Sequence, residues 1–313
     1  MEGNCLGFPQ SVNTAYLTTV FDCGNMSEES PVSPLEPPGL DEHAKRLARS
    51  AVEFHWDPAA INVRADQEAV SELSRVEFTR LRGLLAQFGA GEQAVTTDLA
   101  PLAVVLAGTD DQRYVATQLY DEARHTELFD RYWKRVIRPE EESRGLIPTD
   151  PMADRWSHDD YRELFDRTSN AMARLLEQDT SETRVQAFCH YHLTVEGILA
   201  QTAYRWVETR YSGELEEVPE LPSLANGFRY LRRDEGRHVS FGVTKVRKLV
   251  NEGVDPEMVV ETIDELVPLV ETTIGQMIRD GSIGADRNEI FNRIDTARDR
   301  RLEQVGVVPS ERT

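Results

Sequence analysis

Two copies of one five-residue motif constrain this chain more than any other feature of its sequence. Asp121–His125 and Asp234–His238 both read Asp-Glu-small-Arg-His. In each copy a glutamate precedes a histidine by three residues, which on a helix places both side chains on one face. A single Glu-x-x-His motif is weak evidence, but two copies with matching flanks favour a shared metal site.

Two further glutamates complete a ligand set. Glu92 lies 30 residues before Glu122, the glutamate of the first motif. Glu196 lies 39 residues before Glu235, the glutamate of the second motif. Each interval is long enough for one helix to end and another to return beside it. This order is the ligand pattern of ferritin-like dinuclear carboxylate bundles, so the sequence predicts an all-α, ferritin-like four-helix core with additional helices. The predicted metal ligands are Glu92, Glu122, His125, Glu196, Glu235 and His238.

The donor set indicates which metals the site would take. Four carboxylates and two imidazoles are rich in oxygen, which suits iron or manganese better than zinc. Four carboxylate charges roughly balance two divalent cations, and without metal four buried carboxylates would be very costly to ionise together. We therefore expect two transition-metal ions in the core of the bundle.

An aspartate opens each copy of the motif. Asp121 and Asp234 directly precede a ligand glutamate and lie four residues before a ligand histidine. A carboxylate beside a metal-bound imidazole commonly fixes its tautomer, and we expect this role of Asp234, with Asp121 as the second candidate. The alternative is a surface salt bridge with an arginine of the motif, Arg124 or Arg237.

The chain divides into three parts by composition and periodicity. Residues 1–40 are rich in Gly, Pro, Ser and Asn and predict a flexible N-terminal extension. Residues 41–304 show helical periodicity and predict the ferritin-like dinuclear-metal helical domain. Within it, helices are expected over 64–88, from 92 with a kink at Pro101, and from 112 to 137. Residues 305–313 predict a loose C-terminal tail.

The formal net charge of −20 argues against two classes of partner. Such an acidic surface repels nucleic acid and anionic membranes. No apolar run reaches the roughly 20 residues that a membrane span needs, so none is expected. The three cysteines, Cys5, Cys23 and Cys189, are odd in number and lack zinc-type spacing, which favours a reducing cytoplasm.

Two more residues lie close to the predicted ligands along the chain. Val95 follows Glu92 by three residues and shares its helix face. Tyr191 precedes Glu196 by five residues, which in a straight helix places it roughly 140° away. A π-bulge between them would bring Tyr191 to the ligand face, and such bulges favour functional sites. From the residues alone, ordinary core is the better explanation of Val95 and Tyr191.

The motifs resemble those of a known family, the ligand-binding oxidases related to ribonucleotide reductase small subunits. Residues Glu92–Leu102 are similar to the first ligand helix of that family, and Glu122–Arg131 are similar to its first Glu-x-x-His helix. The resemblance covers about residues 45–300. It implies a homodimer with a mixed manganese–iron cofactor, a pair of irons being the alternative. By position, Glu92 and His125 would hold manganese, Glu196 and His238 iron, and Glu122 and Glu235 both.

The resemblance also implies the chemistry. In that family the metal pair activates dioxygen, and an ether link joins a valine to a tyrosine, which here would be Val95 and Tyr191. A long-chain fatty acid-like ligand lies in a hydrophobic channel with its carboxylate on the metals. The implied function is therefore a dinuclear metal-dependent oxidase.

Three other functions share this ligand set. A ribonucleotide reductase small subunit usually carries a radical-storing tyrosine one turn after the first ligand histidine, where this chain has Phe129. A fatty-acyl desaturase or an amine oxygenase would leave Val95 and Tyr191 without a role. An iron-storage or purely structural bundle is the alternative outside the enzymes.

Overall fold

The computed structural model of the chain describes residues 42–214, 218–281, 283 and 285–308. Every regular element in these ranges is a helix and none is a strand, which confirms the all-α prediction. The predicted N-terminal extension, residues 1–40, lies outside the described residues. None of the described helices has the combination of length and apolarity that a membrane crossing requires.

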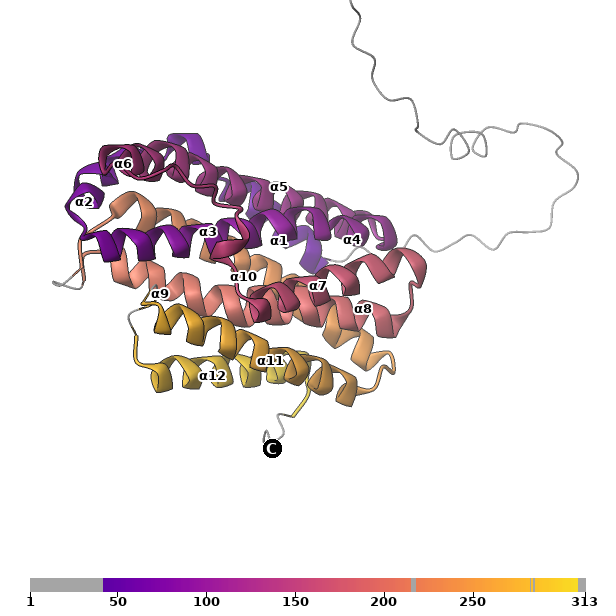
Figure 1. The fold of residues 1–313 in the computed structure, drawn as a ribbon. Helices are drawn as coiled ribbons and strands as arrows, with labels where there is room; N and C mark the ends of the chain where they lie inside the picture. Colours follow the sequence, from indigo (N-terminus) through magenta and orange to yellow (C-terminus); the bar gives the residue numbers. More distant parts are fainter. Residues whose placement is uncertain (1–41, 215–217, 282, 284, 309–313) are drawn as a thin grey trace, which may run out of the picture. The chain divides into compact units, whose positions relative to one another are not determined.

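Four long helical segments form the centre of the domain (Figure 1). They are α3 (Arg75–Asp98), α5 (Thr109–Tyr132), α10 (Pro222–Asn251) and a continuous run of α8 (Ser181–Phe188), η6 (Cys189–Ala200) and α9 (Gln201–Tyr211). α3 packs against α5, and α10 packs against both η6 and α9. The η6 segment is π-helical.

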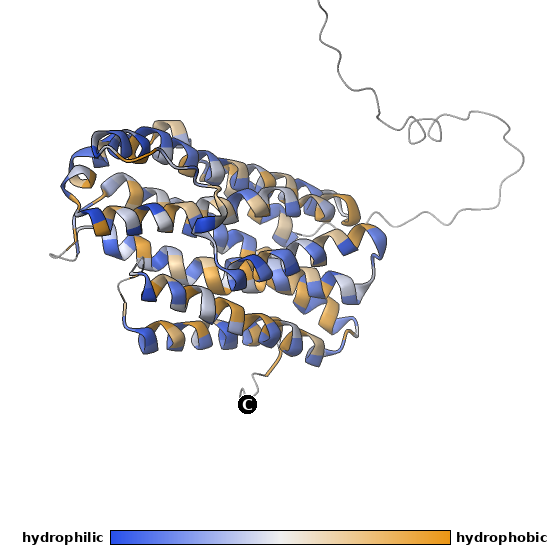
Figure 2. Ribbon diagram, in the orientation of Figure 1, coloured by the Kyte–Doolittle hydropathy of each residue, from blue (hydrophilic) through white to orange (hydrophobic). Residues whose placement is uncertain are grey.

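The remaining helices cover this centre. α1 (Glu42–Glu53) packs on α5, α7 (Asp159–Glu177) packs on α3 and α11, and α11 (Pro256–Arg279) packs on η6 and α12 (Arg287–Val305). Figure 2 shows hydrophobic and hydrophilic residues alternating along these helices, as expected for elements with one buried face. The shorter elements are η2 (Pro58–Ala60), η3 (Val63–Asp66), α2 (Gln67–Glu72), α4 (Ala100–Val105), η4 (Trp133–Ile137), α6 (Arg138–Ser143) and η5 (Asp154–Trp156).

The expected single helix over 64–88 is interrupted at Ser74. The Ser74 hydroxyl accepts a hydrogen bond from the Glu77 backbone N–H at 3.2 Å, and the Glu77 carboxylate accepts one from the Ser74 N–H at 3.0 Å. This reciprocal capping box starts α3 afresh, because it satisfies two N–H groups that lack helical partners. The helix then runs unbroken through Gly89–Gly91 to Asp98.

Pro101 produces a break rather than the expected kink. α3 ends at Asp98 and α4 begins at Ala100, with the proline in its first turn. Proline is tolerated there because the backbone N–H that it lacks would have no helical partner.

The predicted C-terminal tail begins later than residue 305. Val305 is the last residue of α12 and is buried, and Gly306 caps the helix with a positive φ of 86°. Val307 is also buried. Any tail therefore begins no earlier than Val308, and residues 309–313 lie outside the described part of the chain.

Candidate metal centre

The structure brings all six predicted ligands together in the middle of the bundle. We call them the carboxylate–imidazole cluster. They come from four segments: Glu92 from α3, Glu122 and His125 from α5, Glu196 from η6, and Glu235 and His238 from α10. No member is more than 3% exposed. Their potential ligand atoms form two groups of four, and within each group these atoms lie within 4.8 Å of one another.

Glu122 and Glu235 belong to both groups. One Glu122 oxygen lies 3.3 Å from Nδ1 of His125 and the other lies 3.2 Å from Nδ1 of His238. The two oxygens of Glu235 lie 3.4 Å from the same two nitrogens. Each of these glutamates therefore presents one oxygen to each imidazole, which is the arrangement needed to bridge two ions.

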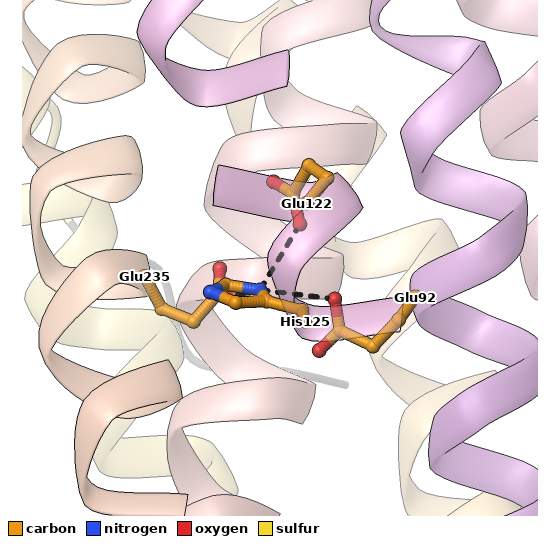
Figure 3. A group of neighbouring side chains, drawn as sticks. All are labelled: Glu92, Glu122, His125 and Glu235. Carbon is orange, nitrogen blue, oxygen red and sulfur yellow. Dashed lines mark hydrogen bonds and ion pairs between the residues drawn. The ribbon is translucent and has the colours of Figure 1, made fainter. Parts of the chain in front are cut away.

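The other members divide the cluster into two halves. In the first half, an oxygen of Glu92 lies 3.2 Å from Nδ1 of His125. Figure 3 shows Glu92, Glu122 and His125 converging, with Glu235 approaching from another helix. In the second half, an oxygen of Glu196 lies 3.3 Å from Nδ1 of His238. Both halves thus offer the same donor types at similar distances.

The π-helix η6 puts Tyr191 and Glu196 into the same site. Both residues lie within Cys189–Ala200, as the prediction of a π-bulge between them required. The i→i+5 hydrogen bonding of a π-helix brings residues five apart close to one face. The fully buried Tyr191 hydroxyl lies 3.2 Å from an oxygen of Glu122 and 3.5 Å from the backbone oxygen of Val95.

The two motif aspartates contact the imidazoles in a crossed pattern. Nε2 of His125 lies 3.3 Å from Asp234, and Nε2 of His238 lies 3.2 Å from Asp121. Each aspartate thus faces the histidine of the other motif and leaves the Nδ1 atoms directed into the cluster. This geometry suits a carboxylate that fixes the tautomer of a ligand histidine.

The alternative of a surface salt bridge is wrong, because the partner arginines are buried with the aspartates. Arg124 and Arg237 are only 2% and 7% exposed. Arg237 donates to Asp234 at 2.7 Å and to Asp121 at 3.0 Å, and Arg124 pairs with Asp121. Burial would raise the pKa of both aspartates, but the imidazoles of His238 and His125 hold the pKa of Asp121 and Asp234, respectively, below its usual value, and Arg237 adds to this effect at both.

Three residues that touch the cluster were not foreseen from the sequence. Tyr204 donates its hydroxyl hydrogen bond to Glu92, and Trp56 donates its indole N–H to Asp234 at 2.7 Å. Gln118 donates its amide N–H to Glu196 at 3.0 Å. Only Gln118 carried a local signal, because it lies four residues before Glu122 and shares its helix face.

Burial and mutual repulsion make the carboxylates hard to ionise together. Burial raises the pKa of Glu92, and burial with the nearby Glu235 raises that of Glu196 well above its usual value. Burial and the Glu122 charge raise the pKa of Glu235 to about 7. Burial would also raise the pKa of Glu122, but the imidazoles of His238 and His125 bring it well below the usual value. The cluster therefore needs positive charge to keep its carboxylates ionised.

Several buried polar atoms of the cluster form no hydrogen bond among the described residues. They are one oxygen each of Glu122, Glu196 and Glu235, and Nδ1 of His238. Buried polar atoms of this kind call for an explanation, and an ion is one that fits. The unsatisfied atoms, the two shared glutamates and the oxygen-rich donor set fit a pair of divalent transition-metal ions.

A narrow pocket of about 40 Å³ adjoins the cluster. It lies between α3, α7, η6 and α11, and its walls are mainly apolar. Phe165 of α7, Leu199 of η6 and Met277 of α11 line it, together with Glu92 and Glu235 of the cluster. Gly91 keeps it open, because a Cβ there would lie 2.8 Å from the Tyr161 hydroxyl. The pocket therefore places apolar side chains directly beside carboxylates of the cluster.

Comparisons with known proteins agree with this geometry. The chain matches the family described as ribonucleotide reductase, small chain, over residues 38–310. Among solved structures, it is similar to a tyrosine-to-phenylalanine variant of an R2-like ligand-binding oxidase with an aerobically reconstituted Mn/Fe cofactor. The identity is 30%, the match covers 83% of this chain and 92% of that chain, and the TM-score is 0.73. A glycine-to-leucine variant of such an oxidase, anaerobically reconstituted with Mn/Fe, is 29% identical over the same shares, with a TM-score of 0.74.

Proposed function

The chain belongs to the ribonucleotide reductase small-chain family, and we propose that it is a dioxygen-activating oxidase with manganese and iron in the carboxylate–imidazole cluster. The observation that carries the proposal is the pair of four-residue groups that share Glu122 and Glu235. The Mn/Fe cofactor of the similar oxidases supports the choice of metals.

The roles of the ligands follow from the two halves. Glu92 and His125 would hold manganese, Glu196 and His238 would hold iron, and Glu122 and Glu235 would bridge the two ions. When bound, the metal pair supplies the site at which dioxygen is reduced and two of the electrons for that reduction. Asp234 and Asp121 keep the imidazole Nδ1 atoms directed at the metals, because each accepts the Nε2 hydrogen of one histidine.

We propose that Val95 and Tyr191 become joined by an ether link during aerobic metal loading. Their closeness supports this, since the phenol oxygen lies 3.5 Å from the backbone oxygen of Val95. The new bond joins that phenol oxygen to a side-chain carbon of Val95 and removes one hydrogen atom from each residue. Dioxygen accepts these two electrons and two protons, and with two more electrons from the metals and two more protons it leaves as two molecules of water.

Peptide mass spectrometry after aerobic loading with both metals tests the link. The peptides that contain Val95 and Tyr191 should run as one species that is two hydrogen atoms lighter than their sum. Tyr191→Phe should bind both metals but give separate peptides. Separate, unmodified peptides from the wild-type protein would overturn the link and favour the desaturase-like alternative.

We further propose that the pocket beside the cluster binds a long-chain fatty acid-like molecule with its carboxylate on the metals. The apolar walls suit the hydrocarbon chain of such a ligand, and the adjoining cluster suits its carboxylate. Pockets for ligands of this size usually measure roughly 300–1,000 Å³. The side chains of Phe165 and Met277 would therefore have to move outward to admit the chain. Organic extraction of the loaded protein should release a long-chain acid that mass spectrometry detects. Gly91→Leu should lower the yield of this acid.

Storage of a tyrosyl radical, as in a ribonucleotide reductase small subunit, has less support. Phe129 occupies the position one turn after His125 and is buried among aromatic rings, 5.7 Å from the Phe228 ring. A phenylalanine has no phenol to oxidise.

A homodimer is proposed from the family resemblance, and light scattering of the metal-loaded protein would measure its mass.

A further inference from the structure

His192 is a buried histidine that the proposed function leaves without a role. It is completely buried, and its ring centroid lies 5.2 Å from that of Phe188 and 4.8 Å from that of Tyr191. Its Nε2 lies 3.2 Å from the amide oxygen of Gln118. Gln118 is therefore the polar partner through which His192 can influence the cluster.

Gln118 connects this histidine to a metal ligand. Its amide nitrogen donates to Oε1 of Glu196 at 3.0 Å while its amide oxygen faces His192. The opposite amide orientation would set an oxygen against the Glu196 carboxylate, which is repulsive. An imidazole that donates from Nε2 holds the amide in the favourable orientation. Burial and the charge of His238 lower the pKa of His192 to about 3, which is consistent with a neutral ring.

Gly242 holds the imidazole in place. It lies on α10, four residues after His238, and a Cβ there would lie 2.3 Å from the His192 Cβ. The backbone of α10 therefore contacts the His192 side chain directly, with no space for another side chain between them. Aromatic rings of α8, η6 and α10 also pack against the imidazole, with the Phe241 centroid at 6.0 Å. The ring has little freedom to turn, so its hydrogen bond to Gln118 has a fixed direction.

We propose that Gln118 and His192 form an amide clamp that fixes the Glu196 carboxylate and so strengthens metal binding in the second half of the cluster. Both are positioning residues, since neither touches a metal position directly. The inference rests on the proposed function. The clamp holds Oε1 of Glu196, while Oε2 of Glu196 has no hydrogen-bond partner among the described residues. In the first half, Glu92 receives its hydrogen bond from the phenol of Tyr204 instead.

The test compares metal release from the two positions in the metal-loaded, full-length protein. Release into a chelator is followed over time, and anomalous diffraction at the manganese and iron edges shows which position empties. Gln118→Leu should release the second-half ion roughly 10- to 100-fold faster, the usual effect of removing such a supporting partner, and leave the first-half ion unchanged. Tyr204→Phe is the matched control, and it should affect the first half only.

Variants of His192 test whether it acts through Gln118. His192→Leu should speed second-half release, and the double variant with Gln118→Leu should be no faster than Gln118→Leu alone. His192→Gln, which keeps a donor, should restore slow release. Gln118→Glu keeps the size of the side chain but removes the donor, and it should also empty the second half. This variant replaces Gln118→Leu if the leucine variant does not fold.

The outcomes separate the clamp from the proposed function. If wild-type protein takes up no second metal ion, the proposed function fails. If it takes up two ions and both Gln118 variants release them at the wild-type rate, or release both ions equally faster, the clamp is overturned. Additive effects of His192→Leu and Gln118→Leu on the release rate would show that His192 does not act through the Gln118 amide. That result would also overturn the clamp.

Discussion

The two halves of the carboxylate–imidazole cluster are alike in their ligands and different in what surrounds them. In each half, one imidazole Nδ1 lies 3.2–3.4 Å from oxygens of three glutamates. Outside the ligands, Tyr204 contacts Glu92 in the first half, whereas Gln118 contacts Glu196 in the second. Any difference in affinity between the two positions therefore comes from the surroundings rather than from the donor types.

The packing around the halves is reversed. Four residues after the first ligand histidine stands the bulky Phe129, and it packs against Gly89 of α3, where a Cβ would lie 3.3 Å from the phenylalanine Cβ. Four residues after the second ligand histidine stands Gly242, and the bulky partner is His192 of η6. The bulky side chain thus comes from α5 in the first half and from η6 in the second. The one in the second half, His192, contacts Gln118, whereas Phe129 has no polar atom in its side chain.

Removal of a shared glutamate should have the largest effect on metal content, because both halves use it. The experiment tests whether the two halves share ligands. Glu122→Ala should cost the protein both metal ions, since one oxygen of Glu122 faces each imidazole. Glu92→Ala should cost the first-half ion only. Metal analysis of purified protein, in ions per chain, measures both variants. Loss of only one ion from Glu122→Ala would mean that the halves do not share this ligand.

The crossed aspartates give the next largest effect. Asp234→Asn should weaken metal binding in the first half by roughly 10- to 100-fold, and Asp121→Asn should do so in the second half. The reason is that each aspartate contacts the histidine of the other motif. Chelator competition with site-resolved anomalous diffraction measures this. The reverse assignment would show that each aspartate serves its own motif in solution.

Acidification should weaken both halves through Glu235, the glutamate that belongs to both groups. Metal binding needs ionised carboxylates, so a protein with raised carboxyl pKa values binds more weakly as pH falls. The pKa of the shared Glu235 is about 7, so affinity should drop through this range by about tenfold per pH unit for each proton displaced. Burial and a neighbouring carboxylate raise the pKa of the unshared glutamate in each half, Glu122 acting on Glu92 and Glu235 acting on Glu196. Metal titrations between pH 6 and 8 should therefore show loss of affinity in both halves, and loss from one half alone would mean that Glu235 is not shared.

Gly242→Ala should have the smallest effect on metal binding. Its main effect should be a lower free energy of unfolding. The added methyl group overlaps the His192 Cβ, and overpacking of this kind costs about 1–3 kcal/mol of the free energy of unfolding. Denaturant unfolding of the metal-free protein measures the cost, with the open position Gly236 as the matched control in Gly236→Ala. Faster release from the second half of the loaded variant would add support for the clamp, and a stable variant with unchanged release would count against it.

Local sequence determined the fold class and the six residues that meet in the cluster. Helical periodicity and the Glu-x-x-His spacing are local, and they place side chains on one face whatever lies opposite. The same reasoning placed Tyr191 beside Glu196 on condition of a π-segment, which η6 provides. It missed the break at Ser74, because a capping box competes there with an otherwise continuous helical pattern.

Only the tertiary structure decided what stands behind the ligands. The crossing of Asp121 and Asp234, the hydrogen bond from Tyr204 to Glu92 and the contact of Trp56 with Asp234 all join residues on different elements. Such contacts depend on how far each helix is shifted and rotated against its neighbours. That register is set by the packing of the whole core, so no local spacing along this chain reveals it.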